Sequence, residues 1–218
     1  MAYRDTRGPG QDAVAQLWAQ ARAGEDPRSR RDAALIALLY GMGLRAGEVL
    51  TLDFEHYDHQ RGLLAVREKK GGGERRLLTL PPEAREALDR WIEIRGLEPG
   101  PLFLGLQTAG RGQIPTLPPP GKRKTMSRYA LDRIVRRWSV YTGSRVRAHG
   151  LRHSAITACL DQGFGVREVQ RFARHANIQT TTMYDDNRED IGGKVAAAHL
   201  AELEADRKKI EAREGRKK

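Results

Sequence analysis

The 218-residue sequence predicts a mainly α-helical domain with one small antiparallel β-sheet (α+β). Most of the chain places apolar residues at helical spacing. One region instead holds two short apolar runs joined by a glycine-rich turn, which is typical of a β-hairpin. Apolar residues make up 39% of the chain and aromatic residues only 6%, so aliphatic side chains must fill most of the core. The length suits one large domain.

The first half of the chain divides into an arm, two helices and a hairpin. Residues 1–10 are polar and are expected to form a flexible arm. Helical spacing predicts helices over 12–23 and 29–42, the second ended by glycines, and a further helical turn beginning near Arg45. Apolar residues at 63–66 and 77–80 predict the two hairpin strands, with Lys69, Lys70 and three glycines at the tip.

The second half is predicted to be helical on either side of one long loop. Prolines open a helix that ends near Arg95. Residues 105–124 are rich in glycine and proline and form the loop. Ser127 is expected to cap a helix to Tyr141, and helices fit 149–162 and 166–175. We expect residues 11–192 to be the main domain and the charged residues 193–218 to be a helical tail.

The formal net charge is +11, from 39 Lys and Arg against 28 Asp and Glu. Such an excess indicates an anionic partner, with nucleic acid the first candidate and a membrane surface the second. No apolar stretch reaches the roughly 18 residues of a membrane span. The strongest local candidates for nucleic-acid contact, and so for DNA contact if the nucleic acid is DNA, are basic groups in the loop and in the helix after it: Lys122, Arg123, Lys124, Arg133, Arg136 and Arg137.

The single cysteine, Cys159, excludes an intramolecular disulfide and a cysteine-based zinc site. This suits a reducing cytosol. The N-terminal residues hold no apolar run, which speaks against a secretory signal. We therefore expect a cytoplasmic protein.

The segment from His149 to His153 carries the first chemical signal. His149 and Arg152 are three residues apart, so a helix beginning here would place both on one face. A phosphodiester suits such a pair, because Arg neutralises its non-bridging oxygens and His donates a hydrogen bond or moves a proton. Taken alone, the pair could equally be two surface side chains.

Three further segments make the pattern specific, and they are Gly43–Glu48, Ala173–Ala176 and Thr180–Tyr184. In this order, from about Arg30 to Tyr184, the chain resembles the tyrosine recombinase (phage integrase) family. The family pattern is an Arg in a Gly-Leu-Arg-x-x-Glu turn, a hairpin Lys, His-x-x-Arg, a His or Trp, and a Tyr nucleophile. The resemblance implies a tyrosine recombinase catalytic-domain fold of DNA breaking-rejoining enzymes.

The resemblance also implies a role for each matched residue. Arg45 and Arg152 would bind the scissile phosphate, and His149 and His175 would assist. Tyr184 would attack phosphorus and form a 3′-phosphotyrosine link. Lys70 would protonate the leaving 5′ oxygen, although the adjacent Lys69 is an alternative that the sequence leaves open, and Lys69 is otherwise expected to contact DNA. The remaining residues expected to support the site are Glu48, beside Arg45, and His153, beside Arg152.

Neither a metal nor a cofactor is expected, because the bond energy is kept in the phosphotyrosine link. The acidic residues after Tyr184 read as a solvated turn. The expected partner is double-stranded DNA, bound by a homotetramer that would be a monomer or weak oligomer without DNA. The family often has Gly where this chain has Arg174, which would alter the local surface or add a phosphate contact.

Two features concern the chain ends. The core-binding domain that usually precedes the catalytic domain is expected to be absent. Residues 194–212, with a stripe of Leu200, Leu203 and Ile210, could be exchanged between subunits or could pack on their own domain.

Three functions fit the sequence. The first is a site-specific recombinase that cuts and rejoins DNA. The second is a type IB topoisomerase-like nicking-closing enzyme, against which the integrase-style spacing argues. The third is a catalytically inactive DNA-binding regulator, against which the retained Arg, His and Tyr residues argue.

Overall fold

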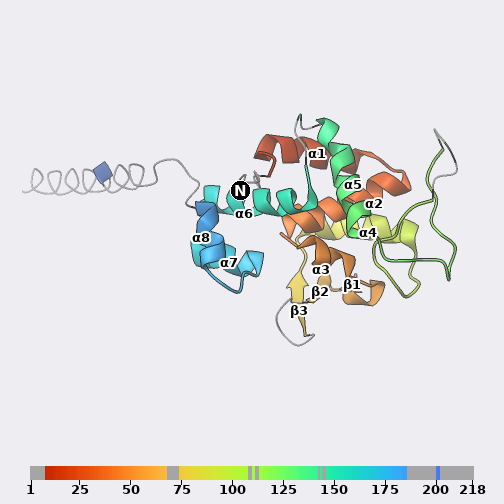
Figure 1. Cartoon of the computed structure of the whole chain (residues 1–218). Helices are drawn as coiled ribbons and strands as arrows, with labels where there is room; N and C mark the ends of the chain where they lie inside the picture. Colours follow the sequence, from red (N-terminus) through yellow and green to blue (C-terminus); the bar gives the residue numbers. More distant parts are fainter. Residues whose placement is uncertain are drawn as a thin grey trace, which may run out of the picture.

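The computed structural model describes residues 8–67, 74–107, 110, 113–141, 143, 146–185 and 200–201. It confirms a mainly helical fold with a small antiparallel sheet (Figure 1). In chain order, the α-helices are α1 (Gln11–Ala23), α2 (Pro27–Ile36), α3 (Ala46–Leu50), α4 (Pro82–Arg95), α5 (Arg128–Trp138), α6 (Ala148–Asp161), α7 (Val166–Ala173) and α8 (Gln179–Asp185). None of the helices in the described part of the chain combines the length and apolar character needed to cross a membrane.

The sheet consists of β1 (Tyr57–Asp58), β2 (Leu63–Arg67) and β3 (Arg75–Thr79), in that spatial order. The register of the predicted hairpin pairs Leu64 with Leu78 and Val66 with Arg76. Leu64 and Val66 point into the core, while β3 is largely exposed, so one face of the hairpin carries the packing. The tip of the hairpin, with Lys69 and Lys70, lies outside the described residues.

Two clusters of buried residues build the interior. The larger joins α1, α2, α4, α5, the sheet and the start of α6. The smaller consists of Ile156, Leu160, Val169 and Ala173, with Tyr184 packed against it. Figure 1 shows α7 and α8 at one end of α6, to the side of the main body. The C-terminal part of α6 therefore connects the main core to the small cluster that supports Tyr184.

The arm and the tail are described only in part. Pro9 accepts a hydrogen bond from Ser154 through its carbonyl at 2.5 Å, so the end of the predicted arm contacts α6. Residues 1–7 lie outside the described residues. The same holds for the predicted tail apart from 200–201, where Leu200 is exposed.

A buried carboxylate, Asp32 on α2, fastens α5 to the core. Its side chain is fully buried and pairs with Arg31 at 2.8 Å and with Arg137. It also accepts a hydrogen bond from the Trp138 indole at 2.9 Å. Two cations and one indole N–H thus depend on a single carboxylate that water does not reach.

We expect Asp32→Ala to lower the free energy of unfolding by about 3–5 kcal/mol, because it leaves the buried Arg31 guanidinium without its carboxylate partner. Chemical denaturation measures this change. Glu93→Ala is the matched control, since it breaks an exposed ion pair with Arg30 (2.5 Å) that contributes at most about 1 kcal/mol. Equal losses for the two variants would refute the structural role of Asp32.

Candidate active site

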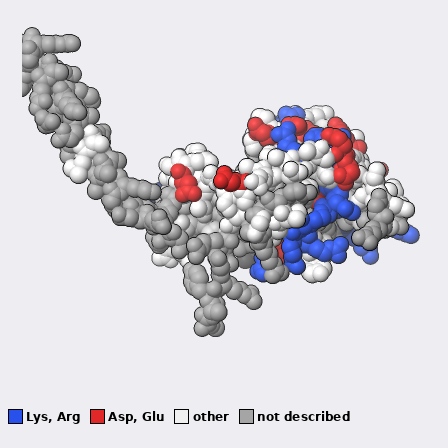
Figure 2. Space-filling view, turned by 90° about the horizontal axis from the view of Figure 1, so that it is seen from above, with Lys and Arg blue, Asp and Glu red and all other residues white. Residues whose placement is uncertain are grey.

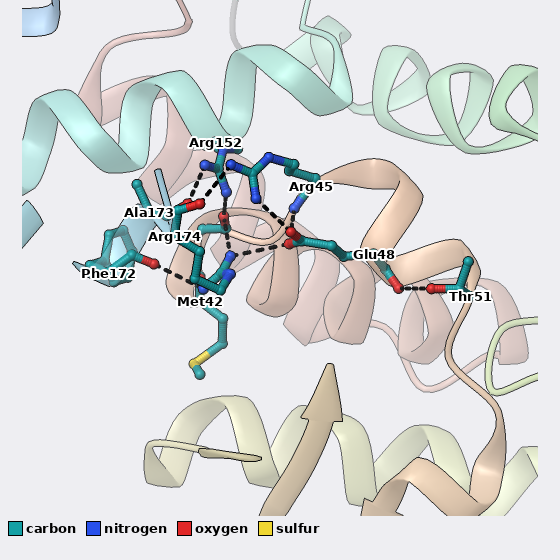
Figure 3. Close-up of polar contacts among 9 residues, drawn as sticks. Met42, Arg45, Glu48, Thr51, Arg152, Phe172, Ala173 and Arg174 are labelled. Carbon is teal, nitrogen blue, oxygen red and sulfur yellow. Dashed lines mark hydrogen bonds and ion pairs between the residues drawn. The ribbon is translucent and has the colours of Figure 1, made fainter. Parts of the chain in front are cut away.

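The site begins at the turn after α2, which passes through a short π-helical segment (Ala37–Gly41) before it reaches Gly43. Gly43 has a φ of +55°, and a Cβ atom there would lie 2.8 Å from the Phe172 ring. Both the conformation and the space therefore require glycine. This turn directs the Gly43 carbonyl toward the guanidinium groups of Arg152 and Arg174 (Figure 3).

Arg45 directly precedes α3, and Glu48 in the first turn of that helix holds it. The Glu48 carboxylate accepts a hydrogen bond from the Arg45 backbone N–H at 2.8 Å and pairs with the Arg45 guanidinium at 2.6 Å. Glu48 is only 6% exposed, whereas the Arg45 side chain is 31% exposed. The expected contact between Glu48 and Arg45 is confirmed, and Arg45 stays accessible to a ligand.

The predicted helical placement of His149 and Arg152 is confirmed, because α6 begins at Ala148. Arg152 is 2% exposed and donates to the carbonyls of Gly43 and Ala173 (Figure 3). Burial, followed by the neighbouring charges of Arg45 and Arg174, lowers the pKa of Arg152 to about 10. Arg152 therefore remains a cation at neutral pH and links the Arg45 turn to the end of α7.

His149 lies at the exposed start of α6. Partial desolvation of its ring lowers its pKa, and the positive charges of Arg152, Arg128 and Arg45 act in the same direction. His149 is therefore mainly neutral at neutral pH, which is the form that can accept a proton.

His175 follows the turn that ends α7, and a buried threonine orients its ring. Its Nδ1 atom lies 2.9 Å from Thr181 Oγ1, and Thr181 is fully buried. Desolvation, followed by the charges of Arg152 and Arg45, lowers the pKa of His175 to about 4. The ring is therefore neutral near pH 7, and when the threonine hydroxyl donates to Nδ1 the Nε2–H is available to a ligand.

Tyr184 lies beside His153 and His175. Its ring centroid is 4.4 Å from that of His153 and 6.0 Å from that of His175. Burial raises the pKa of Tyr184, and the opposing charges of Arg152 and Arg45 do not fully compensate. The phenol therefore stays protonated near neutral pH. A base must therefore take its proton when it reacts.

The free energy of unfolding is expected to fall as the pH decreases from about 6.5 to 4. The unfolded chain binds a proton at His175 near pH 6.5, whereas the folded chain binds it near pH 4, so unfolding takes up protons between these values. Because the ring is only half-buried, we expect a loss on the order of 1–2 kcal/mol. His175→Gln should flatten this part of the stability curve. An unchanged slope would contradict the assigned protonation state.

The predicted DNA contacts have different surroundings. Lys122 and Lys124 are exposed. Arg123 instead bonds to Glu98 at 2.6 Å and to the Arg95 carbonyl, so its guanidinium already stabilises the loop. Arg137 pairs with Asp32.

On α5, Arg133 and Arg136 are exposed, and both line a cavity of about 600 Å³. Arg28, Arg31 and Arg137 also line this cavity, which has an apolar floor that includes Ile134. Figure 2 shows Lys and Arg side chains gathered in a band where α5 lies in Figure 1.

Sequence reasoning missed three contributors to the site. Thr181 orients His175, and Arg174 bonds to Glu48 and to the Gly43 carbonyl. Arg128 at the start of α5 is close enough to shift the pKa of His149. The only signal for Arg174 was an arginine in place of the expected turn glycine, and no signal marked the other two.

Comparison with known proteins identifies the family. The phage integrase family model matches residues 10–190. A tyrosine recombinase of Synechococcus elongatus is 33% identical over 93% of this chain and 61% of its own length. The tyrosine recombinase XerC of Pseudomonas aeruginosa is 37% identical over 73% of this chain and 48% of its own length. The chain thus spans only about half to three fifths of these relatives.

Solved structures show the same fold. A crystal structure of XerA recombinase superposes with a TM-score of 0.67 at 22% identity, over 88% of this chain and 64% of that one. The XerH site-specific recombinase in a post-cleavage complex with its palindromic difH substrate gives 0.63 at 18% identity, over 88% and 53%. These likenesses show the fold, and the family-model match over residues 10–190 shows that the chain belongs to the phage integrase family of tyrosine recombinases.

Proposed function

We propose that this chain is the catalytic domain of a tyrosine-type site-specific recombinase, which cleaves and rejoins DNA through a 3′-phosphotyrosine intermediate. One observation carries the proposal. Tyr184 lies against His175 and within electrostatic reach of Arg45 and Arg152, although these residues come from four separate segments of the chain. The residues proposed as nucleophile, phosphate-binding cations and hydrogen-bond donor thus lie within one site, which supports the proposal.

In the proposed cleavage step, the Tyr184 oxygen attacks the scissile phosphorus. A bond forms between phosphorus and the phenol oxygen, and the bond from phosphorus to the 5′ oxygen breaks. The phenol proton passes to a base, for which His149 is the candidate because its lowered pKa keeps it neutral. The leaving 5′ oxygen takes up a proton, and Lys70, or the neighbouring Lys69, is the proposed donor.

Arg45 and Arg152 are proposed to stabilise the negative charge that develops on the phosphate oxygens during cleavage. Arg45 is partly exposed and can turn a guanidinium edge toward a non-bridging oxygen. Arg152 adds a fixed positive charge from inside the protein, where the low dielectric strengthens its effect. A bound phosphate would also favour a protonated His175 and so raise its pKa from the value without ligand.

Rejoining reverses the step. The free 5′-hydroxyl of a partner strand attacks the phosphotyrosine, the bond to Tyr184 breaks and the phenol regains a proton. The phosphodiester energy is retained throughout, so the proposed chemistry needs no ATP and no metal. The double-stranded DNA substrate is proposed by analogy with two structural neighbours, XerH bound to its difH substrate and the Tn1549 transposon integrase in complex with transposon right end DNA. We extend the proposal to a homotetramer on DNA in a cytoplasmic, nucleoid-associated setting.

A nicked duplex library tests the proposed function. Each duplex has a randomised segment and a nick a few nucleotides 3′ of the candidate cleavage positions, so that the short 5′-hydroxyl fragment dissociates and religation is prevented. With EDTA present, we expect covalent protein–DNA complexes that survive denaturation and that carry the protein on a 3′ end.

Cleavage that leaves a free 3′-hydroxyl, or that requires a divalent metal, would contradict the proposed chemistry. Selection of one recurring sequence among the trapped duplexes supports a site-specific recombinase. Trapping without sequence preference, together with relaxation of supercoiled plasmid, would instead indicate a nicking-closing enzyme.

The exposed arginines of α5 are expected to contact DNA phosphates. Arg133→Ala/Arg136→Ala should weaken duplex binding uniformly across sequences and reduce the slope of log K against log salt by roughly one per lost contact. Titration of a fluorescent duplex at several salt concentrations measures both quantities.

The matched control, Arg22→Ala/Arg90→Ala, also removes two charges. These two arginines pair with Glu86 and Glu25 on the surface of α1 and α4, so their loss should leave the slope unchanged. Equal slopes for both double variants would refute the assignment of α5.

A further inference from the structure

Arg174 has a backbone conformation that an arginine rarely adopts. It ends α7 in the left-handed region with a φ of +52°, and among the described residues it is the one non-glycine residue with a positive φ. Glycine adopts this conformation without strain, whereas a side chain with a Cβ atom does not. A turn of this kind would therefore be more stable locally with glycine.

The Arg174 side chain is also buried at a cost. It is 6% exposed, and its Nε–H has no hydrogen-bond partner in the described part of the chain. A buried donor without a partner costs free energy. The positive φ and the unpaired Nε–H both disfavour arginine at this position. The contacts of its guanidinium must therefore compensate for these two costs.

Those contacts connect Arg174 to Arg45 and to the turn that Arg152 also contacts. The guanidinium donates to the carbonyls of Gly43 (2.8 Å), Met42 (3.3 Å) and Phe172 (2.9 Å), and it pairs with Glu48 at 3.2 Å (Figure 3). The Arg174 carbonyl accepts a hydrogen bond from Arg45 at 2.9 Å. One residue thus bonds to the turn that carries Arg45, to its carboxylate and to Arg45 itself.

Glu48 is the point where Arg174 and Arg45 compete. The carboxylate is buried and ionised, because Arg174 and Arg45 together lower its pKa against the effect of burial. If Arg174 were removed, Arg45 would be the only cation left in contact with this carboxylate among the described residues. Arg45 would then be held more tightly by Glu48 and would be less available to a phosphate.

We propose that Arg174 is a positioning residue for DNA cleavage, which shares Glu48 and the Gly43 carbonyl so that Arg45 and Arg152 keep their places and Arg45 stays available to the scissile phosphate. The proposal rests on the proposed function of the site. It differs from a phosphate contact, because Arg174 is proposed to act on Arg45 through Glu48 and the Gly43 carbonyl.

Single-turnover cleavage of the nicked duplexes trapped by the native protein tests this role. Arg174→Gly suits the backbone conformation, so we expect this variant to fold and to bind the duplex with unchanged affinity. Its cleavage rate should fall by about tenfold. Arg174→Lys keeps the charge near Glu48 but cannot reach the same set of carbonyls, so its rate should be intermediate. Arg171→Ala removes an exposed charge from the same helix and should cleave like the native protein.

A double-mutant cycle with Glu48→Gln separates positioning from a merely structural role. If Arg174 acts through Glu48, Arg174→Gly should slow cleavage much less in the Glu48→Gln background than in the native background. Equal slowing in the two backgrounds would overturn the proposal, as would a native rate in Arg174→Gly or a rate that follows only its folded fraction. Absence of cleavage by the native protein would instead refute the proposed function.

Discussion

Replacing Tyr184 with phenylalanine is expected to abolish covalent capture of DNA while leaving folding and DNA binding nearly unchanged. The ring packs on the small cluster that includes Ile156 and Ala173 and lies 4.4 Å from His153, and phenylalanine retains both contacts. Only the hydroxyl is lost, and without it no oxygen is positioned to form the bond to phosphorus. The expected loss is therefore complete within detection, far beyond the effect of any packing change.

Covalent trapping on the nicked duplexes measures the first effect, and fluorescence anisotropy with an intact duplex measures binding. Tyr40→Phe is the matched control, because it removes a partly buried phenol hydroxyl in the segment after α2. It should trap DNA like the native protein. Residual trapping by Tyr184→Phe at more than background would mean that another side chain is the nucleophile.

Arg152→Ala is expected to reduce the cleavage rate by roughly 10²–10³-fold or more, the range found when one preorganised donor is removed from a transition state. It should also destabilise the fold. The Ala173 carbonyl would lose its Arg152 donor, whereas the Gly43 carbonyl would keep the bond from Arg174. A lost buried hydrogen bond of this kind costs about 1–3 kcal/mol.

Rates normalised to the folded fraction distinguish the two effects of this variant. Arg147→Ala, which removes an exposed cation just before α6, provides the comparison for loss of charge alone. A normalised rate for Arg152→Ala close to that of Arg147→Ala would refute the phosphate-binding role.

The long amphipathic helices and the hairpin could be predicted because they follow simple periodicities. The helix Pro82–Arg95 and the Ser127 cap of α5 are found as expected, and Ser127 accepts a hydrogen bond from the Ala130 N–H at 3.1 Å. The pairing of β2 with β3 is also confirmed. In each case local sequence and global packing favour the same structure.

Two elements were missed because their sequences do not favour them locally. Helix α8 begins with Gln179 and three threonines, whose β-branched side chains have low helix propensity. Packing of Tyr184 and burial of Thr181 stabilise it instead. Strand β1 has only two residues, too few to show an alternating pattern, and pairs with Leu63 and Leu64 of β2.

Candidate catalytic residues could be named from the order of the sequence motifs, but the electrostatic state of these residues could not be predicted. For Tyr184, burial outweighs the charges of the nearby arginines and raises the pKa of the phenol. The role of Arg174 could not be predicted either, because its position beside His175 in the sequence suggests an exposed residue. In the fold, the turn directs its side chain inward onto Glu48. Burial and long-range contacts are set by the whole fold.

The central claim is that Tyr184 forms the covalent bond to DNA. Proteolysis of the trapped complex, nuclease digestion and mass spectrometry of the nucleotide-bearing peptide test it most directly. We expect a single modified peptide that contains Tyr184, with a nucleotide attached through its 3′ phosphate. Modification of any other residue, or a link through a 5′ phosphate, would contradict it.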